Sequence, residues 1–576
     1  MTANPRPASA AFLLAVASAA FAGTARAQQP MARVSVDANG AQASYGGGNP
    51  ALSADGRWVV FESTSDDLVA GDTNGESDVF VHDRASVAVV RVSVSSTGAE
   101  GDLGSYDASI SADGRFVVFD SDADNLIAHD TNYVTDVFLH DRDPDGNGIY
   151  DEGNGTTRRV SVDSNWKQAW GWSFDPQISA DGTCVVFSSY ADNLVAGDTN
   201  QQTDVFVRDL KAHTTERVNV DSAGKQSFGP SWFPSISSDG GVVAFVSDAP
   251  DLVAGDTNDY QDVFVHDRAS GTTVRVSVDS AGNQADGRSY VSPFSISDDG
   301  NRVAFYSSAY NLVANDTNGR WDAFVRDLAA GTTVRASVGS TGAQSLDGTG
   351  VHDVSISGDG TAVFFTSDGG DLVPRDSNGV TDCFRHDLVT GATDLISGDF
   401  ATNSGDGPSK QVVANRDGSV VAFASYAADL VDGDTNDAWD AFVFDRNVVP
   451  LQGSWTNYGA GLAGTLGVPS IALSADPEFG ASPTLDVGNS AGAWSVAFLV
   501  VGTARTSLPV AGGTLLVLPG TIAAEGLPLA GLSLGFTVPY DAKLFGVVLD
   551  VQVIEIDPGA SQGLSFTPGL ELVFGQ

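Results

Sequence analysis

The chain has 576 residues and a formal net charge of −44, and both values limit what the protein can be. A chain of this length can build more than one hydrophobic core. Because 73 acidic residues face only 29 basic ones, no basic stripe could neutralise phosphates. The composition therefore argues against a nucleic-acid partner and disfavours an anionic membrane surface.

Residues 1–27 have the pattern of a signal peptide. Arg6 lies in a short n-region, residues 8–22 form an Ala-rich apolar segment, and an A-x-A sequence at 25–27 predicts cleavage before Gln28. No other segment approaches the ~20 unbroken apolar residues of a membrane span. We therefore expect the mature bacterial protein to be secreted, periplasmic or located in the cell envelope, without a transmembrane segment.

One segment, DTNGESDVFVHDR from Asp72 to Arg84, recurs along the chain with variations. The copies begin at Asp72, Asp130, Asp198, Asp256, Asp316, Asp376 and Asp434. Each repeat combines a turn such as SADG (53–56) with short apolar runs such as Trp58–Phe61 and Val79–Val81. Runs of this length, bounded by Gly, Asp, Asn and Ser, predict strands and turns. Four strands per repeat are typical of a propeller blade.

The outer strands of the repeats indicate how the ring closes. They begin near Arg33, Arg91, Arg159, Arg217, Arg275, Arg335 and Asp394. The first, at 33–36, precedes any complete blade, and the last DAFVFDR run (440–446) has no outer strand after it. We therefore predict a seven-bladed β-propeller over residues 32–449 whose N-terminal strand completes blade 7 and removes open edges. The alternative is a solenoid, which would need capping repeats.

After the repeats the composition changes. Residues 451–576 are poor in charge and contain alternating apolar runs, which predict a separate β-sandwich of roughly eight strands. The fold class is therefore all-β. Cys184 and Cys383 lie in different blades, so we expect no disulfide between them.

Both regions resemble known protein families. SADGRWVVF (53–61), DVFVHDR (78–84) and TTVRVSV (272–278) are similar to the TolB-like propeller repeats of exported bacterial proteins, although Ala54 replaces the family's Pro. TolB rings have six blades, whereas seven repeats are counted here. Residues 485–502 and 557–575 resemble a small domain attached to repeat proteins of planctomycete-type bacteria. The resemblance implies the fold; such propellers bind proteins, carry hydrolase domains or have no known role.

An insertion in the second repeat has the oxygen-rich pattern of a calcium loop. Positions 1, 3, 5 and 9 hold side-chain oxygens, position 6 is Gly148 and position 7 offers a carbonyl; the predicted ligands are Asp143, Asp145, Asn147, Ile149 and Asp151. Asn154 replaces the bidentate Glu expected at position 12. Structural Ca²⁺ is therefore predicted, against the alternative of an unliganded acidic turn.

The DTN loops offer a second possible metal site. Asp72, Asn74 and Asp78, with their repeat equivalents, place oxygens at positions 1, 3 and 7. The alternative is an Asx turn in which these side chains bond local N–H groups.

Tryptophans are concentrated in one sector of the chain. Trp166, Trp170 and Trp172 precede the third repeat's inner strand, and Trp232 precedes the fourth. We expect these loops on the same face as the DTN loops, where aromatic rings beside carboxylates would suit a sugar or peptide ligand. The alternative is packing between adjacent blades.

No catalytic residue is predicted. GLSLG at 531–535 matches the nucleophile-elbow pattern around Ser533, but its flanks indicate strands and no histidine follows His386. We interpret the protein as an exported, non-enzymatic and monomeric binding or display module for an extracellular or envelope protein or glycan. Two alternatives stay open: a carbohydrate-active or peptidase-type enzyme acting at the aromatic face, and a purely structural envelope protein.

Overall fold

The computed structural model describes residues 30–398, 403–448, 454–478, 481–510, 513–517, 521–536, 538 and 547–574, and every regular element in them is a β-strand. The expected signal peptide lies outside the described residues. The chain divides into two compact units, Met31–Asn447 and a unit that includes Val448–Gln576. Within the described parts, no helix is long and apolar enough to cross a bilayer.

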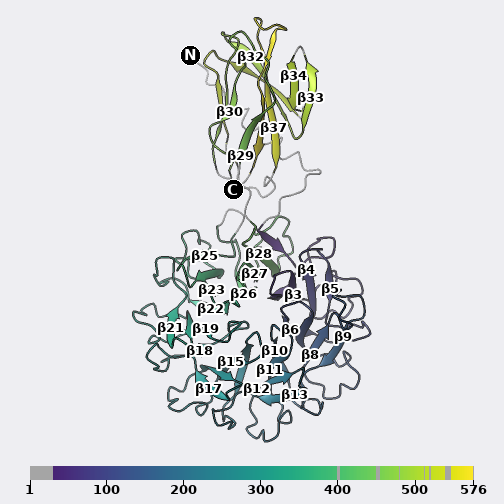
Figure 1. Cartoon of the computed structure of the whole chain (residues 1–576), viewed down its shortest axis with the longest axis vertical. Helices are drawn as coiled ribbons and strands as arrows, with labels where there is room; N and C mark the ends of the chain where they lie inside the picture. Colours follow the sequence, from purple (N-terminus) through teal and green to yellow (C-terminus); the bar gives the residue numbers. More distant parts are fainter. Residues whose placement is uncertain are drawn as a thin grey trace. The chain divides into compact units, whose positions relative to one another are not determined.

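The first unit contains seven four-stranded antiparallel sheets arranged around a common centre (Figure 1). From the inner to the outer strand, sheet 1 comprises β2 (Gly48–Leu52), β3 (Trp58–Ser63), β4 (Asp78–Asp83) and β5 (Val89–Arg91). Sheet 2 comprises β6 (Ser105–Ile110), β7 (Phe116–Ser121), β8 (Asp136–Asp141) and β9 (Thr156–Arg159). Sheet 3 comprises β10 (Ser173–Ile178), β11 (Cys184–Ser189), β12 (Asp204–Asp209) and β13 (Thr214–Arg217).

The remaining sheets follow the same order. Sheet 4 comprises β14 (Ser231–Ile236), β15 (Val242–Ser247), β16 (Asp262–Asp267) and β17 (Thr272–Arg275). Sheet 5 comprises β18 (Ser289–Tyr290), β19 (Arg302–Ser307), β20 (Asp322–Asp327) and β21 (Thr332–Arg335). Sheet 6 comprises β22 (Val351–Ile356), β23 (Ala362–Ser367), β24 (Asp382–Asp387) and β25 (Thr393–Leu395). Sheet 7 comprises β26 (Ser409–Ala414), β27 (Val420–Ser425), β28 (Asp440–Asp445) and β1 (Met31–Arg33).

Hydrophobic clusters between neighbouring sheets hold the unit together. The two middle strands of every sheet each contribute a buried phenylalanine, and the two rings stack, as Phe61 and Phe80 do at 5.7 Å between centroids. The repeated apolar runs of the sequence therefore become middle strands that are buried on both faces. Aromatic pairs of this kind stabilise beyond the area that they bury.

Sheet 7 is assembled from both ends of the repeat region. β1 pairs antiparallel with β28, with Ala32 opposite Val443, and the N–H of Val34 donates to the carbonyl of Ala441 at 2.8 Å. Strand β1 starts two residues before the expected Arg33. The residues after Arg33 still contribute, because buried Ser35 donates through its hydroxyl to Asp440 at 2.5 Å.

The strand register corrects one sequence alignment. Arg275 lies opposite Phe264 in sheet 4, whereas Leu395 lies opposite Phe384 in sheet 6. In sheet 6, the residue at the position of the arginines is therefore Leu395 and not Asp394.

The second unit is described by three groups of strands. A six-stranded sheet contains β29 (Ser454–Tyr458), β39 (Gly569–Val573), β37 (Val548–Ile556), β32 (Ser495–Gly502), β35 (Thr521–Leu527) and β38 (Leu564–Phe566). A three-stranded sheet contains β30 (Ile471–Leu473), β31 (Thr484–Val487) and β36 (Leu532–Gly535), and a hairpin contains β33 (Arg505–Val510) and β34 (Gly513–Val517). More strands are present here than the roughly eight expected for a sandwich of this size.

Candidate functional site

The inner strands carry a bulge that turns one residue of most sheets toward the centre. The pairing skips between positions such as Gly48 and Ala51, and the residue within the skip has a positive φ. These residues are Asn49 (47°), Asp107 (50°), Asp175 (52°), Phe233 (51°) and Gln411 (58°). A bulge leaves the extra residue unpaired and redirects its side chain, so these sheets deliver a selected residue to one place.

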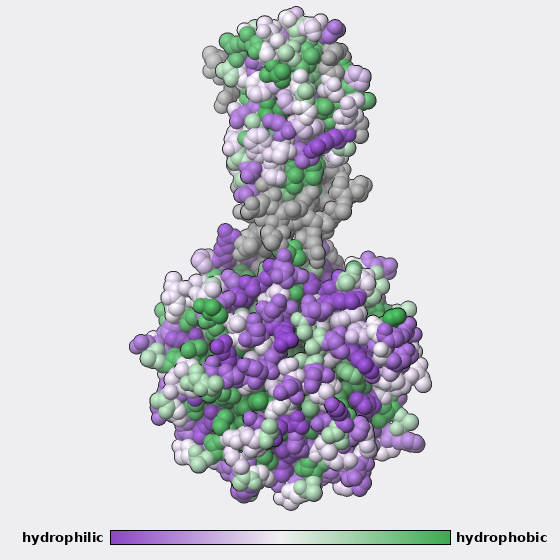
Figure 2. Space-filling model, in the orientation of Figure 1, coloured by the Kyte–Doolittle hydropathy of each residue, from purple (hydrophilic) through white to green (hydrophobic). Residues whose placement is uncertain are grey.

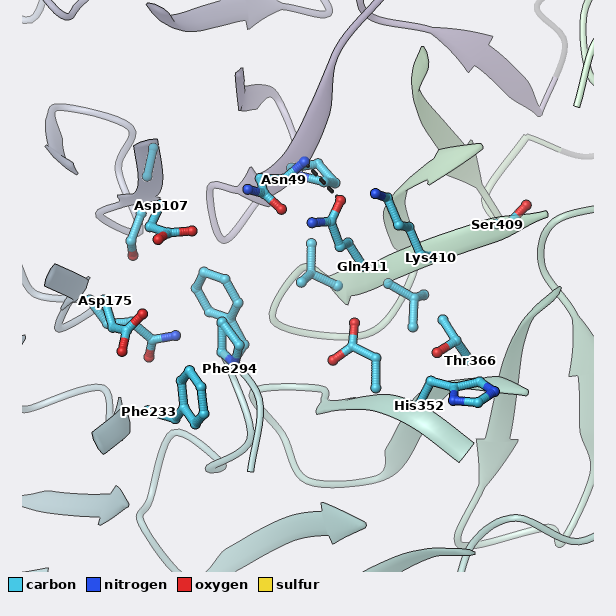
Figure 3. A pocket seen from close by; sticks show the side chains of 18 of the residues that line it. Asn49, Asp107, Asp175, Phe233, Phe294, His352, Thr366, Ser409, Lys410 and Gln411 are labelled. Carbon is cyan, nitrogen blue, oxygen red and sulfur yellow. Dashed lines mark hydrogen bonds between the residues drawn. The ribbon is translucent and has the colours of Figure 1, made fainter. Parts of the chain in front are cut away.

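These residues line a cavity at the centre of the unit, which we call the central cavity. Its volume is about 660 Å³, and its lining includes Asp107, Asp175, Phe233, Asp353 and Gln411. Figure 3 shows the carboxyl groups of Asp107 and Asp175 on one side and Lys410 and Gln411 on the other. The volume lies within the range of small-ligand pockets. Hydrophilic residues cover much of the visible face of this unit, with hydrophobic ones scattered between them (Figure 2).

Carboxyl and amide oxygens satisfy the N–H groups that the bulges leave unpaired. Glu62 of sheet 1 accepts from the N–H of Asp107 in sheet 2 at 2.5 Å, and Gln411 of sheet 7 accepts from Asn49 in sheet 1 at 3.1 Å. The carboxyl groups of Asp120, Asp175 and Asp353 accept in the same way from residues 175, 233 and 411 of the next sheet. Buried backbone donors need such partners. These acidic residues are therefore needed in part by the fold itself, because they bind the backbone N–H groups of the bulges.

Burial raises the pKa values of these acids, and for Glu62 and Asp175 the negative charge of Asp107 raises them further. Burial and Asp107 raise the pKa of Glu62 to about 8 and that of Asp175 to about 7. Burial raises the pKa of Asp353 to about 6, and it also raises the pKa of Asp107, whose side chain is open to the cavity. The cavity therefore holds carboxyl groups that exchange protons near neutral pH, which is unusual for acids.

Phe294 crosses the central cavity. It lies on the connection between β18 and β19, has a φ of 62°, and its carbonyl accepts from the N–H of Ile356. Its phenyl group packs against hydrophobic clusters formed by sheets 7, 1 and 2. These sheets lie across the central cavity from sheet 5, to which Phe294 belongs. The longer connection in sheet 5 makes this reach possible. A phenylalanine with positive φ is strained and needs surrounding structure to hold it.

The predicted tryptophan site is spread over three environments. Trp166 stacks on Arg208 at 4.5 Å and lies 5.2 Å from His213, at the end of β12 away from its DTN loop. Trp232 lies in β14 and packs against the cluster between sheets 4 and 5. The location of Trp166 therefore differs from the expected neighbourhood of the DTN loops.

Trp170 and Trp172 do lie beside a DTN-bearing connection. The N–H of Trp170 donates to Asn193 at 2.9 Å, and the carbonyl of Trp172 accepts from the N–H of Tyr190 at 2.9 Å. Asn193 and Tyr190 belong to the connection between β11 and β12. Because Trp170 is 71% exposed, packing between sheets does not account for it.

The insertion loop of sheet 2 is organised around Asp143. This carboxylate accepts from the N–H groups of Asn147 and Gly148 at 3.0 and 2.9 Å, and the amide of Asn147 donates to Glu152 at 2.7 Å. Asp151 is paired instead with buried Arg142, its Oδ1 lying 3.0 Å from Nε. Asp143, Asp145 and Asn147 are residue types that a calcium loop uses, and Glu152 contacts Asn147. No three acidic, His or Cys residues of the described parts are grouped around one metal position.

The DTN loops contain an ion pair that the sequence analysis did not anticipate. In sheet 4, the guanidinium of Arg275 lies 3.5 Å from Asp256 and 3.1 Å from Asp262. Asn258 completes an Asx turn and also donates to Asp262 at 3.2 Å. Metal binding by these loops stays a prediction. In sheet 4, the positive charge between Asp256 and Asp262 comes from the guanidinium of Arg275.

The central cavity was missed by sequence reasoning, although a signal was present. A polar or aromatic residue stands third in most inner strands, as Asp107 does in SYDASI and Phe233 in SWFPSI. In a regular strand with alternating side chains, this third position would be apolar. A polar or aromatic residue there interrupts the alternation and therefore indicates a bulge. Ser533, by contrast, lies within β36 beside Asp486, in a strand and not at an elbow.

Comparisons with known proteins give only weak structural similarities. No family model and no curated protein matches the chain. A solved Agrobacterium tumefaciens protein assigned to TolB is 15% identical with a TM-score of 0.33, covering 62% of this chain and 93% of its own. A prolyl endopeptidase structure is 11% identical (TM-score 0.40; 78% and 55% covered), and Porphyromonas gingivalis dipeptidyl peptidase 4 is 12% identical (0.36; 78% and 66%).

These scores are too low to support conclusions about fold or function. The strand topology itself confirms the predicted all-β chain of repeated four-stranded sheets.

Proposed function

We propose that the protein is an exported, non-enzymatic, monomeric binding module whose ligand enters the central cavity. In this proposal the seven sheets are the blades of one propeller, and the second unit is a β-sandwich that attaches the module to the envelope. The observation that carries the proposal is the cavity of about 660 Å³, into which bulges direct carboxyl, amide and aromatic side chains. Pockets that combine apolar walls with a few convergent polar groups are the usual binding sites of proteins.

The chemistry of the lining favours a ligand with an amino or guanidinium group beside an apolar part. Asp107 and Asp175 offer carboxyl groups, and Phe233 and Phe294 offer apolar surface next to them. A basic segment of an extracellular or envelope protein has this chemistry. Because the pKa of Asp175 is raised to about 7, a cation that binds there should displace a proton.

The test is calorimetric titration of the mature protein at pH 6.5 to 7 with short peptides that contain Arg or Lys beside an aromatic residue. We expect proton release on binding, seen as heats that depend on buffer ionisation, and at least tenfold weaker binding in Asp175→Asn. Asp259→Asn, on an exposed loop, is the matched control. Equal binding of acidic peptides, or none at millimolar concentration, would refute the proposal.

A glycan at the tryptophan face is the other ligand class. Trp170 is exposed, so Trp170→Ala should change stability by less than about 0.5 kcal/mol. Loss of oligosaccharide binding in this variant, with peptide binding unchanged, would move the site from the cavity to the tryptophan face. Absence of any ligand in both assays would favour the structural envelope role.

A hydrolase is the second candidate function, and one observation favours it. Asp107 and Asp175 line the same cavity, and Asp107 raises the pKa of Asp175, as occurs in pairs of catalytic carboxyl groups. Turnover of peptide or glycan substrates that disappears in both Asp107→Asn and Asp175→Asn would establish it.

Calcium binding by the insertion loop also belongs to the proposed function, as a structural element. Asp143, Asp145, Asn147 and the carbonyl of Ile149 would hold the ion, with Glu152 supplying a further carboxylate. Asp151 would keep its pairing with Arg142. The ion would stiffen the loop.

A further inference from the structure

A buried arginine lies between two aspartates in six of the seven sheets described. The arginine comes from the outer strand, and the aspartates open the DTN loop and the third strand. The pairs are Arg91 with Asp72 and Asp78 (3.0 and 3.0 Å), Arg159 with Asp130 and Asp136 (3.4 and 2.9 Å), Arg217 with Asp198 and Asp204 (3.1 and 3.1 Å), Arg275 with Asp256 and Asp262 (3.5 and 3.1 Å), Arg335 with Asp316 and Asp322 (3.2 and 3.1 Å), and Arg33 with Asp434 and Asp440 (3.9 and 3.6 Å).

In sheets 3 and 7 a glutamine assists the arginine. In sheet 3, Gln226 donates to Asp198 at 3.2 Å while it accepts from the N–H of Thr199. In sheet 7, Gln42 donates to both Asp434 and Asp440 at 2.8 and 2.9 Å. In these two sheets the aspartate pair is neutralised and hydrogen-bonded, which a buried charge requires. In sheets 2 and 5 the arginine lies at ion-pair distance from both aspartates, and Asp130 and Asp316 each keep one oxygen without a hydrogen bond.

Sheet 6 keeps the two aspartates and loses both partners. Leu395 occupies the position of the arginine, as the register opposite Phe384 shows. Ser404 occupies the position of the glutamine; it bridges to residue 398 as Gln284 bridges to Val278, and its hydroxyl accepts from the N–H of Ser377 at 3.2 Å. Two long donors are thus replaced by two short side chains that cannot neutralise a carboxylate.

The aspartates of sheet 6 remain buried. Asp376 is 7% exposed and Asp382 is fully buried. Neither carboxylate oxygen of Asp376 has a hydrogen-bond donor of normal geometry among the described residues; the backbone N–H of Asn378 and the carboxyl group of Asp382 lie close to it. Asp382 accepts from Ser397 and Asn378 at 2.7 and 2.8 Å, which are neutral groups. A buried carboxylate without a donor indicates that a partner is missing.

We propose that a hard metal cation of the calcium class binds between Asp376 and Asp382 and replaces, in sheet 6, the guanidinium of the other six sheets. The two carboxylates and the Ser404 hydroxyl would supply protein oxygens, and water would complete the shell. No group of three or more acidic, His or Cys residues in the described parts is arranged around a metal, so we expect a partly hydrated ion with moderate affinity.

The electrostatic surroundings agree with this assignment. Besides burial, Asp347 and Asp371 raise the pKa of Asp376, which shows that further negative charge lies near the pair. A proton shared by the two carboxyl groups is the competing explanation, because burial raises the pKa of Asp382 to about 7. The two explanations differ in whether added cation binds.

The test uses the mature protein with Asp143→Ala and Asp145→Ala, which removes the insertion loop as a calcium ligand. After treatment with a chelator, calorimetric titration with CaCl₂ should give one equivalent, and EDTA should lower the Tm. Leu395→Arg should abolish that equivalent and make the Tm insensitive to EDTA, because the guanidinium takes the cation's place. Asp376→Asn should abolish the equivalent as well, and it decides the matter if Leu395→Arg does not fold.

A gain of binding provides the matched control. Arg275→Leu combined with Gln284→Ser converts sheet 4 into the pattern of sheet 6 and should add a second equivalent. The proposal is overturned if the parent variant takes up no Ca²⁺ at millimolar concentration, if only Mg²⁺ or Na⁺ binds, or if Leu395→Arg binds Ca²⁺ unchanged. The site is independent of the ligand proposed for the central cavity.

Discussion

At the scale of single residues, Glu62 shows how the acidic composition is used inside the fold. Its carboxyl group is nearly buried, accepts from the backbone of Asp107 and from Asn49, and stays protonated to about pH 8. The unfolded chain would release this proton near the ordinary pKa of 4.5. The folded state therefore binds more protons between these values, and its stability falls as the pH rises through them.

This gives a prediction for Glu62→Gln, which keeps an acceptor and removes the titration. The variant should be more stable than the wild type at pH 9 and no more stable near pH 5. The upper limit of the difference is about 5 kcal/mol, at about 1.4 kcal/mol per pKa unit. Thermal melts across this pH range measure it, with exposed Glu76→Gln as the control. Parallel pH profiles for wild type and Glu62→Gln would contradict the raised pKa.

At the scale of elements, β1 carries the closure of sheet 7. It pairs with β28, places Val34 in the cluster between sheets 7 and 1, and brings Arg33 to Asp440. Deleting residues 32–37 should expose the edge of β28 and leave Asp434 and Asp440 without their arginine.

The deletion is therefore expected to lower the Tm and to cause concentration-dependent light scattering. Val34→Asp, which leaves the strand's length intact, should lower the Tm without the same scattering, because the edge stays covered. An unchanged melting curve of the deletion variant would show that β1 does not close the ring.

The insertion loop of sheet 2 should behave as a separable element. Asp143→Ala with Asp145→Ala should remove one calcium equivalent in calorimetric titration and leave the repeat unit folded, because the other six sheets form without this insertion. Asp259→Asn, on an exposed loop of another sheet, is the matched control. A wild-type protein that binds no calcium at millimolar concentration would refute the assignment.

At the scale of the whole molecule, Phe294 connects opposite sides of the ring. Since it is half-buried and packs against sheets 7, 1 and 2, Phe294→Ala should cost about 2 kcal/mol of unfolding free energy, roughly half the loss for a fully buried phenylalanine. Phe233→Ala, which removes a 42% exposed ring, should cost less. Chemical denaturation measures both, and equal losses would argue against a contact across the ring.

The sequence by itself determined the elements of this protein and their repetition. Short apolar runs between Gly, Asp and Asn turns predict strands such as Trp58–Ser63, because β-branched and aromatic residues suit a sheet buried on both faces. The recurrence of DTN and DVFV predicts one supersecondary unit repeated along the chain. The outer strand that precedes the first repeat indicated where the two ends meet. All of this depends on local pattern and counting.

Only the tertiary structure decided which side chains of different repeats and strands lie next to one another. The central cavity is assembled from residues about 60 positions apart, and local sequence gives no distance between them. The pairing of Arg275 with Asp256 and Asp262 joins an outer strand to a loop, so neither motif alone reveals it. The shift from Asp394 to Leu395 depended on strand register, because sliding by one residue reverses every side chain. Contacts between distant segments and their charges, which local pattern does not encode, determine where this protein can bind.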